Sequence, residues 1–170
     1  MWVPATATGD VEPPLSPPVA LYFSPNGGAR QAIIDQINSA ETEILVAAYS
    51  LTSAPITESL VAASRRGVRI HIVLDRRVPT ARKTQYPAIR RASIDTRVDR
   101  IHQLMHQKVI VIDRRVLLTG SYNFTDNAEL RNSEILLVIT DPATASKVAA
   151  RFETLYKLST PAHLVSPGRK

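Results

Sequence analysis

Residues 105–134 read MHQKVIVIDRRVLLTGSYNFTDNAELRNSE and predict two strands joined by a tight turn. The four apolar β-branched residues at 109–112 show no polar alternation, which is typical of a strand buried on both faces. Residues 113–115 (DRR) have the composition of a turn, and residues 116–119 then form the returning strand of a hairpin. We expect the rest of the chain to act as the scaffold of this hairpin.

Polar residues stand at the open end of the predicted hairpin. His106 and Lys108 are two positions apart, so in a strand their side chains point to the same face. Ser121 and Asn123 follow the returning strand, which brings them back towards that pair. An imidazole, an ammonium, a hydroxyl and a carboxamide therefore converge. The pattern predicts an anion-binding site that contains a potential nucleophile.

The spacing of these residues resembles HxKx4Dx6GSxN, the signature of the phospholipase D superfamily. It is matched by His106, Lys108, Asp113, Gly120, Ser121 and Asn123. Glu134 stands where that family places a carboxylate partner for the motif histidine. The alternative is a buried strand with an unrelated His and Lys at its mouth and an ordinary Gly-Ser turn, which requires several coincidences of spacing.

The segments AAYSLT at 47–52 and RRGVRIHIVLD at 65–75 are also similar to those of small bacterial Nuc-type endonucleases of this superfamily. The likeness covers roughly residues 19–158. It implies a phospholipase D-like catalytic domain with one motif per chain, a homodimer, and catalysis without a metal. It also implies a periplasmic or secreted location, with a cytoplasmic one left open.

The order of elements predicts an α/β fold. Strands are expected at 19–23, 43–49 and 68–75, with helices at 29–39 and 55–66 between them. This alternation is typical of parallel βαβ units. We expect a single domain with a mixed, largely parallel central sheet that is flanked by helices on both faces. Later elements are a short basic helix within 79–91, strands at 94–98 and 133–140, and a last helix opened by Asp141-Pro142.

Two terminal segments are expected to lie outside this domain. The Pro-rich residues 1–18 predict a disordered leader without the basic and apolar regions of a signal peptide, and residues 159–170 predict a flexible tail. The whole chain has 170 residues, of which 44% are hydrophobic, and this suits one globular domain. No apolar run approaches the roughly 20 residues of a membrane helix.

The composition predicts no metal site and no cofactor. There is no cysteine, and the four histidines have neither clustered carboxylates nor ligand spacing. His71 lies inside a predicted strand and is expected to serve the scaffold. His102 lies four residues before His106, at the approach to the site, and no motif supports a catalytic role for it.

The positive charge of the chain is concentrated before the motif. The net charge is +6 and the isoelectric point about 10.0, which favours a polyanionic partner. The segment 76–100 holds eight basic and two acidic residues, so its charge matches that of the entire chain. A solvated loop is the simpler explanation, but the segment leads directly into the motif, and we expect it to bind nucleic-acid phosphates. The candidates are Arg76, Arg77, Arg82, Lys83, Arg90 and Arg91.

The motif residues suit cleavage of a phosphodiester, which needs a nucleophile, neutralisation of charge and a proton for the leaving oxygen. His106 is the expected nucleophile, and Glu134 is expected to hold its second ring nitrogen. Lys108 and Asn123 would bind phosphate oxygens, and Ser121 would add a hydrogen bond. Asp113 and Gly120 are assigned to the turn and the fold.

One histidine cannot easily be both nucleophile and general acid in an in-line displacement, so two motifs should meet at a two-fold axis. We therefore expect a metal-independent endonuclease that cleaves DNA, with RNA as a further substrate, through a phosphohistidine. The alternative is a phosphodiesterase of phosphatidyl lipids or cardiolipin. No amphipathic anchor is evident and aromatic residues make up 5% of the chain, so no stable membrane association is expected. A third hypothesis is a nucleic-acid-binding module without activity.

Overall fold

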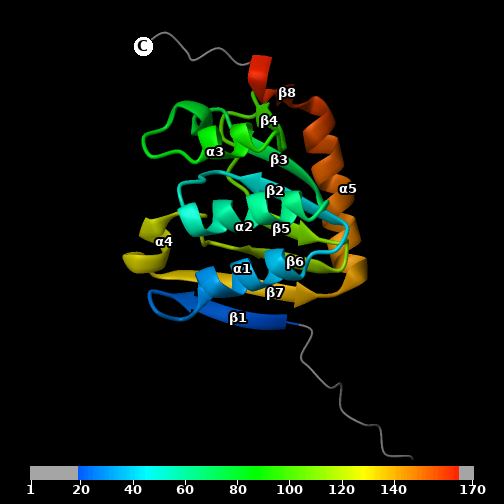
Figure 1. Cartoon of the computed structure of the whole chain (residues 1–170). Helices are drawn as coiled ribbons and strands as arrows, with labels where there is room; N and C mark the ends of the chain where they lie inside the picture. Colours follow the sequence, from blue (N-terminus) through cyan, green and yellow to red (C-terminus); the bar gives the residue numbers. More distant parts are fainter. Residues whose placement is uncertain (1–18, 165–170) are drawn as a thin grey trace, which may run out of the picture.

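The computed structural model describes residues 19–164, and within them the strands form one sheet in the order β1-β7-β6-β5-β2-β3-β4-β8 (Figure 1). The predicted leader and the end of the predicted tail lie outside the described residues. The strands are β1 (Val19–Ser24), β2 (Glu43–Ala48), β3 (Arg69–Asp75), β4 (Asp95–Asp99), β5 (Lys108–Ile112), β6 (Val116–Gly120), β7 (Glu134–Thr140) and β8 (Thr160–Pro161). The helices are α1 (Ala29–Ser39), α2 (Ala54–Arg65), α3 (Tyr86–Arg91), α4 (Asp126–Leu130) and α5 (Pro142–Leu158), with 3-10 turns η1 (Val78–Thr80) and η2 (Ala162–Leu164).

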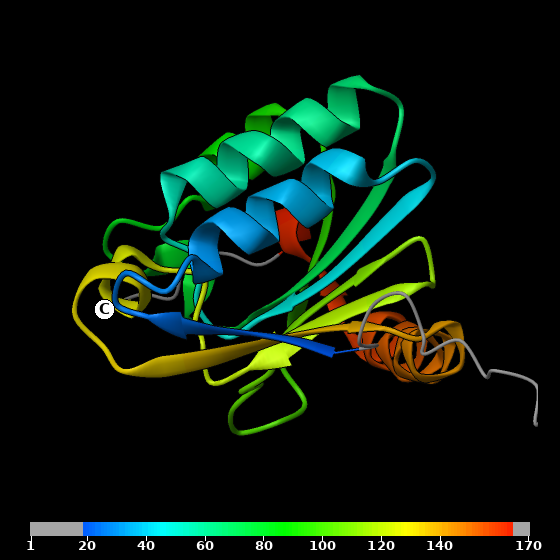
Figure 2. The ribbon, with the colours of Figure 1, turned by 90° about the horizontal axis from the view of Figure 1, so that it is seen from below.

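Helices cover both faces of the sheet, as predicted. In Figure 2, α1 and α2 lie on one side of the strands and α5 lies on the other. The core is divided in the same way. Ile44 and Val46 of β2 belong to the α1–α2 side, whereas Leu45 and Ala47 pack on the α5 side. The α/β class and the single domain are therefore confirmed.

The expectation of a largely parallel sheet is wrong. Among the strand pairings within residues 19–164, only β2–β3 and β3–β4 are parallel, and the other five are antiparallel. The chain reverses at residues 113–115 and again between β6 and β7. These reversals insert β5, β6 and β7 between β1 and β2, so β1 pairs antiparallel with β7 at the edge of the sheet.

The central hairpin forms with the predicted burial. Ile110 and Ile112 of β5 face the α1–α2 side, and Val111 faces α5, so this strand is buried on both faces. The strand begins at Lys108, however, and His106 lies in the segment before it. The pairing of β5 with β6 ends at Val109 and Thr119. Lys108 and His106 therefore lie beyond the paired part of the hairpin.

The domain also continues beyond the predicted boundary at residue 158. Thr160 and Pro161 pair with β4, where a flexible tail was expected. The reason lies in Arg97 of β4, whose guanidinium donates to the carbonyls of Tyr156 and Ser159, each at 3.2 Å. The same guanidinium lies 4.2 Å from the ring centroid of Tyr156. These contacts bind the end of α5 to the sheet.

Candidate active site

The motif residues lie together at one end of four neighbouring strands. The register pairs Lys108 of β5 with Ala48 of β2, and Gly120 of β6 with Leu136 of β7. Because these strands are adjacent, the starts of β5 and β7 lie beside the ends of β2 and β6. We call this end of the sheet the motif end. It carries His106, Lys108, Ser121 and Glu134.

His106 and Lys108 form the first half of the site. The Lys108 ammonium lies 3.3 Å from each ring nitrogen of His106 and donates to the His106 carbonyl at 3.0 Å. Tyr49, directly after β2, packs edge-on against the imidazole with ring centroids 4.3 Å apart. The Lys108 ammonium is also 4.8 Å from the centroid of the Tyr49 ring. The lysine is buried and the histidine is exposed, so the imidazole is accessible to a substrate.

Burial lowers the pKa of Lys108 below the value of an ordinary lysine, while the negative charge of Glu134 acts in the opposite direction. Desolvation disfavours the ammonium, and a neighbouring carboxylate favours it. Glu134 is thus close enough to Lys108 to affect its charge. A phosphate bound here would supply further negative charge and would favour the protonated lysine in the same way.

Ser121 and Glu134 form the second half of the site. The Ser121 hydroxyl donates to the Glu134 carboxylate at 2.5 Å and accepts from the Ile135 amide at 3.1 Å. The other oxygen of Glu134 accepts from the Asn132 side chain at 2.9 Å. Among the described residues, no hydrogen bond joins Glu134 to His106. The expected orienting role of Glu134 therefore stays a prediction.

The close packing beside Ser121 requires glycine at position 120. Gly120 has φ +150, and a Cβ placed there would lie 2.1 Å from the carbonyl oxygen of Ile135. A side chain would push β6 away from β7 and would move Ser121 and Glu134 apart. Gly120 therefore sets the distance between the two elements that carry this half of the site.

Asn123 lies in the loop after β6, which is bound to the start of α2. The carbonyl of the next residue, Phe124, accepts from the amides of Thr52 and Ser53 at 3.0 Å. The side-chain oxygen of Asn123 is buried and has no hydrogen-bond partner within residues 19–164. Buried polar groups are nearly always paired, and an unpaired one is found at sites that bind ligands. The unpaired oxygen is an acceptor, so a contact with a phosphate oxygen would have to come from the Nδ2 group of Asn123 instead.

Asp113 lies at the opposite end of β5 from His106. Its carboxylate accepts from the amides of Glu41, Thr42 and Glu43 at 2.8–2.9 Å and from the Thr42 hydroxyl at 2.7 Å. Burial would raise the pKa of Asp113, but these hydrogen bonds lower it below the ordinary value. The side chain ties the hairpin turn to the segment before β2, which is a structural function.

No role was predicted for Asp75, which the structure places behind the site. Its carboxylate is 1% exposed and accepts from the Met105 amide at 3.0 Å. It also accepts from the Arg77 guanidinium at 2.8 Å, and that guanidinium lies 5.1 Å from the Tyr49 ring centroid. Asp75 and Tyr49 stand at the carboxyl ends of β3 and β2, where side chains commonly build sites in α/β folds. The position of Asp75 and Tyr49 directly at the ends of two predicted strands was the sequence feature that could have indicated their role.

The basic residues that were predicted to bind nucleic acid lie at different places in the structure. All six candidates are exposed, but Arg77 is the one that contacts the site through Asp75 and Tyr49. Arg91 lines a groove between α2 and α3. Arg97, which belongs to the same basic segment, is held by the end of α5 and so serves the fold.

His71 and His102, which were not assigned to the site, each lie beside a carboxylate. His71 lies 3.0 Å from Asp95 and packs against Tyr156 of α5, in keeping with a scaffold position. His102 lies 2.7 Å from the buried Asp99, which also accepts from the Ile101 amide. His102 and His106 line the same hollow beside α5.

Within residues 19–164, no three His, Cys, Asp or Glu side chains gather as a group that could hold a metal. No helix in the same part of the chain is both long and apolar enough to cross a bilayer.

Comparison with known proteins places this site in a family. Residues 33–156 match the family profile described as "Cardiolipin synthase, PLD-like domain". The crystal structure of Nuc from Salmonella typhimurium, a phospholipase D family member, is 36% identical with a TM-score of 0.80 over 84% of this chain and 96% of that one. A phospholipase D of Rickettsia felis is 39% identical over 72% of this chain and 62% of its own length. A mitochondrial cardiolipin hydrolase of Xenopus laevis is 28% identical over 94% and 76%.

The chain belongs to the phospholipase D superfamily of phosphodiesterases. It spans about three-fifths of the length of the Rickettsia relatives, and nearly the whole of the Salmonella chain. The printed names of these relatives are phospholipase D, Nuc and cardiolipin hydrolase, and membership of the family leaves the substrate of this chain open.

Proposed function

We propose that this protein is a metal-independent endonuclease that cleaves DNA, and also RNA, at a site shared by two subunits. The observation that carries the proposal is the contact chain from Arg77 through Tyr49 to His106 and Lys108. It makes the basic segment 76–100 continuous with a site built to act on a phosphodiester. Phosphates along a strand can then bind beside the one that reacts.

The proposed reaction has two steps. A ring nitrogen of His106 forms a bond to phosphorus, and the bond to the leaving oxygen breaks as that oxygen takes a proton from the partner subunit's His106. Water then attacks the phosphohistidine, gives its proton to the same partner histidine, and releases the phosphate monoester. Lys108 and Asn123 bind the non-bridging oxygens, where negative charge grows in each transition state.

An uncovered apolar face supports the proposed homodimer. Val19, Leu21 and Phe23 of β1 point to the α5 side of the sheet and are 38%, 53% and 55% exposed. They pair with Ile139, Leu137 and Ile135 of β7, whose side chains share that face. In Figure 2, α5 lies near the start of β1, at the end of this strand away from its arrowhead. A contiguous apolar surface of this kind marks an interaction site.

The uncovered face reaches the active site. Phe23 pairs with Ile135, the residue after Glu134, so the exposed phenyl ring stands at the motif end of the sheet. A second copy docked on this face through a two-fold axis would bring its own motif end close to the first. Such an isologous interface is the common form of a homodimer, and it would supply the second histidine.

A lipid substrate is the second candidate, and one observation favours it. Beside His106 lies a hollow of about 390 Å³ between the segment 101–107 and α5. Its lining includes Ile101, Leu104 and Leu158, which are 59%, 41% and 58% exposed. Acyl chains would bury such residues. The names phospholipase D and cardiolipin hydrolase among the relatives point the same way.

The two candidates can be separated in one assay. The parent protein and His106→Ala are incubated in EDTA with single- and double-stranded DNA, with RNA, and with vesicles of phosphatidylglycerol or cardiolipin. We expect the parent to cleave nucleic acid, and the variant to cleave nothing. Hydrolysis of the lipids with intact nucleic acid would replace the nuclease proposal by the lipid one. Activity that requires added Mg²⁺ or Zn²⁺ would overturn the metal-independent mechanism.

A further inference from the structure

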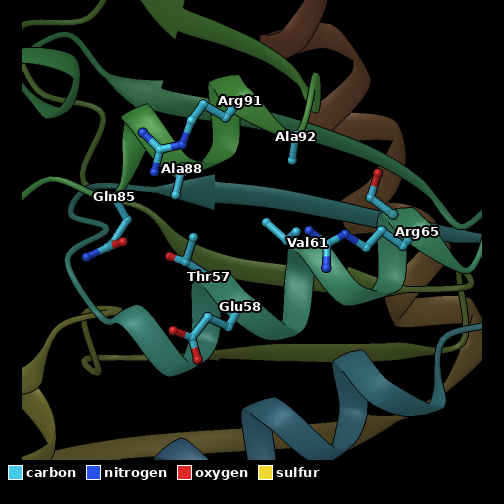
Figure 3. A pocket seen from close by; sticks show the side chains of 9 residues that line it. Thr57, Glu58, Val61, Arg65, Gln85, Ala88, Arg91 and Ala92 are labelled. Atoms are coloured by element: carbon cyan, nitrogen blue, oxygen red, sulfur yellow. The ribbon is translucent and has the colours of Figure 1, made fainter.

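A groove runs between α2 and α3, on the face of the sheet opposite α5 (Figure 3). We call it the α2–α3 groove, and its volume is about 800 Å³. One wall is formed by α2 and the other by α3 and the residues that flank it. The groove is lined by Thr57, Glu58, Val61, Ser64, Arg65, Gln85, Ala88, Arg91 and Ala92.

Two arginines lie on opposite walls of this groove. In Figure 3, the guanidinium groups of Arg65 and Arg91 extend over it, one from each helix. Both side chains are exposed, and neither takes part in a salt bridge within residues 19–164. Arg66 and Arg97 differ, because their guanidinium groups are hydrogen-bonded to backbone carbonyls. The two groove arginines are therefore available for an external anion.

The rest of the lining suits a chain of nucleotides. Gln85, Thr57 and Ser64 offer hydrogen bonds, while Val61, Ala88 and Ala92 offer apolar surface for sugars and bases. Glu58 is the acidic residue of this lining and stands about two helical turns before Arg65. From Thr57 to Arg65 the groove follows α2 for about 12 Å, at 1.5 Å per residue.

The groove is connected to the active site along the surface. Gln85 of the groove lining donates its amide to the carbonyl of Leu51 at 3.0 Å. Leu51 and Thr84 line a neighbouring hollow of about 220 Å³ together with Tyr49 and Arg77. Tyr49 in turn packs on His106. A strand bound at His106 would therefore pass Arg77 on its way to the groove.

We propose that the α2–α3 groove binds the flanking part of a single-stranded nucleic acid whose scissile phosphate lies at His106. This inference rests on the proposed nuclease function. It predicts that binding depends on strand length, because a short strand fills the active site and a longer one also reaches Arg65 and Arg91. A single strand fits the arrangement, since a groove with exposed arginines can follow the backbone of an unpaired strand.

The test compares two charge reversals of equal size in a His106→Ala background, which prevents cleavage. The groove variant is Arg65→Glu with Arg91→Glu. The control variant is Arg69→Glu with Arg115→Glu, two exposed arginines at the other end of the sheet. Fluorescence anisotropy gives Kd for oligothymidylates of 4 and 20 nucleotides over a series of salt concentrations, and circular dichroism confirms folding.

The groove variant should bind the 20-mer more weakly than the parent background does. The factor by which its Kd for the 20-mer rises should be at least about tenfold larger than the factor for the 4-mer. Its log–log salt slope for the 20-mer should fall by about 1.4, at roughly 0.7 per lost phosphate contact. The control variant should lose a smaller factor in affinity, and this factor should be the same for the 4-mer and the 20-mer. The groove proposal would be overturned if the ratio of the 20-mer effect to the 4-mer effect were the same in the groove variant and in the control variant. A parent that hydrolyses a small chromogenic diester but binds neither oligonucleotide would instead overturn the nuclease function.

Discussion

The buried carboxylate of Asp75 accepts a hydrogen bond from the amide of Met105 at 3.0 Å, and so the end of β3 holds the residue that precedes His106. Burial would raise the pKa of Asp75, but the hydrogen bonds from Arg77 and Met105 together lower it below its ordinary value. The carboxylate is therefore ionised at neutral pH. The Asp75 carboxylate thus has two contacts. It forms an ion pair with Arg77, and it accepts the hydrogen bond of Met105, the residue before His106.

Replacing Asp75 should misplace the nucleophile. Asp75→Ala should lower kcat by about 10- to 100-fold with a smaller change in KM, since misplacement of about 1 Å has effects of this size. The unfolding free energy should fall by about 1–3 kcal/mol, because the Met105 amide and Arg77 lose their acceptor. Asp75→Asn keeps one acceptor oxygen and should recover part of kcat. Equal kcat values for both variants and the parent would exclude this positioning role.

His106→Ala should reduce cleavage on the order of 10³-fold or more, as expected when a nucleophile is removed. The fold should persist, because the imidazole is exposed and its main contacts are Tyr49 and Lys108. His71→Ala is the matched control, since His71 contacts Asp95 and Tyr156 away from the motif. Its activity should stay within a few-fold of the parent. If His106→Ala also stays within a few-fold, His102 becomes the next candidate.

The lowered pKa of Lys108 predicts the alkaline limit of activity. Cleavage requires the ammonium, so kcat/KM should fall as pH rises through a pKa below the ordinary value of about 10.4. Glu134→Gln removes the charge that raises this pKa, so the alkaline limb should move to lower pH. Glu153→Gln, which alters an ion pair with Arg114 at the hairpin turn, is the control.

The pH series should be combined with an NMR titration of the lysine side chains, in which Lys108→Met assigns the signal. This titration remains informative if Glu134→Gln retains little activity. A Lys108 signal that titrates at the same pH in the parent and in Glu134→Gln would show that the two charges are not coupled.

Asp113→Ala should destabilise the fold while leaving the activity of the folded protein nearly unchanged. The loss of four hydrogen bonds to a carboxylate should lower the unfolding free energy by about 2–4 kcal/mol in urea at pH 7. Because the folded pKa is lowered, this stabilisation is complete above the ordinary pKa near 4 and is lost as pH falls through the folded value. The difference from the parent should therefore shrink below about pH 4. A difference that is constant down to pH 2 would contradict this account.

The uncovered face of β1 should be the dimer interface. Leu21→Glu places a charge on a side chain that is 53% exposed, so the folded monomer should tolerate it. Sedimentation should show a dimer for the parent and a monomer for the variant, and the variant should lose cleavage. Leu164→Glu, at a residue that is 65% exposed at the other edge of the sheet, is the control and should stay dimeric. A parent that is fully active as a monomer would contradict the shared site.

The sequence alone determined the local elements and the residues of the motif. Periodicity and turn composition depend on neighbours in the chain, so the α1 range was predicted to the residue and β2 and β3 to within one. The fixed spacing from His106 to Asn123 predicts that these side chains meet, because a tight hairpin brings its two ends together. The family followed from that spacing and is confirmed by the comparisons.

Only the tertiary structure decided which distant segments meet. The insertion of β5–β7 between β1 and β2, which makes the sheet mostly antiparallel, depends on strand order, and periodicity carries no information about order. The contacts of Tyr49 with His106 and of Asp75 with Met105 arise from register between strands far apart in sequence. The bond from Ser121 to Glu134 also depends on strand register, here between the consecutive strands β6 and β7. In the first two contacts, at least one partner (Tyr49, or both Asp75 and Met105) has no role predicted from the sequence.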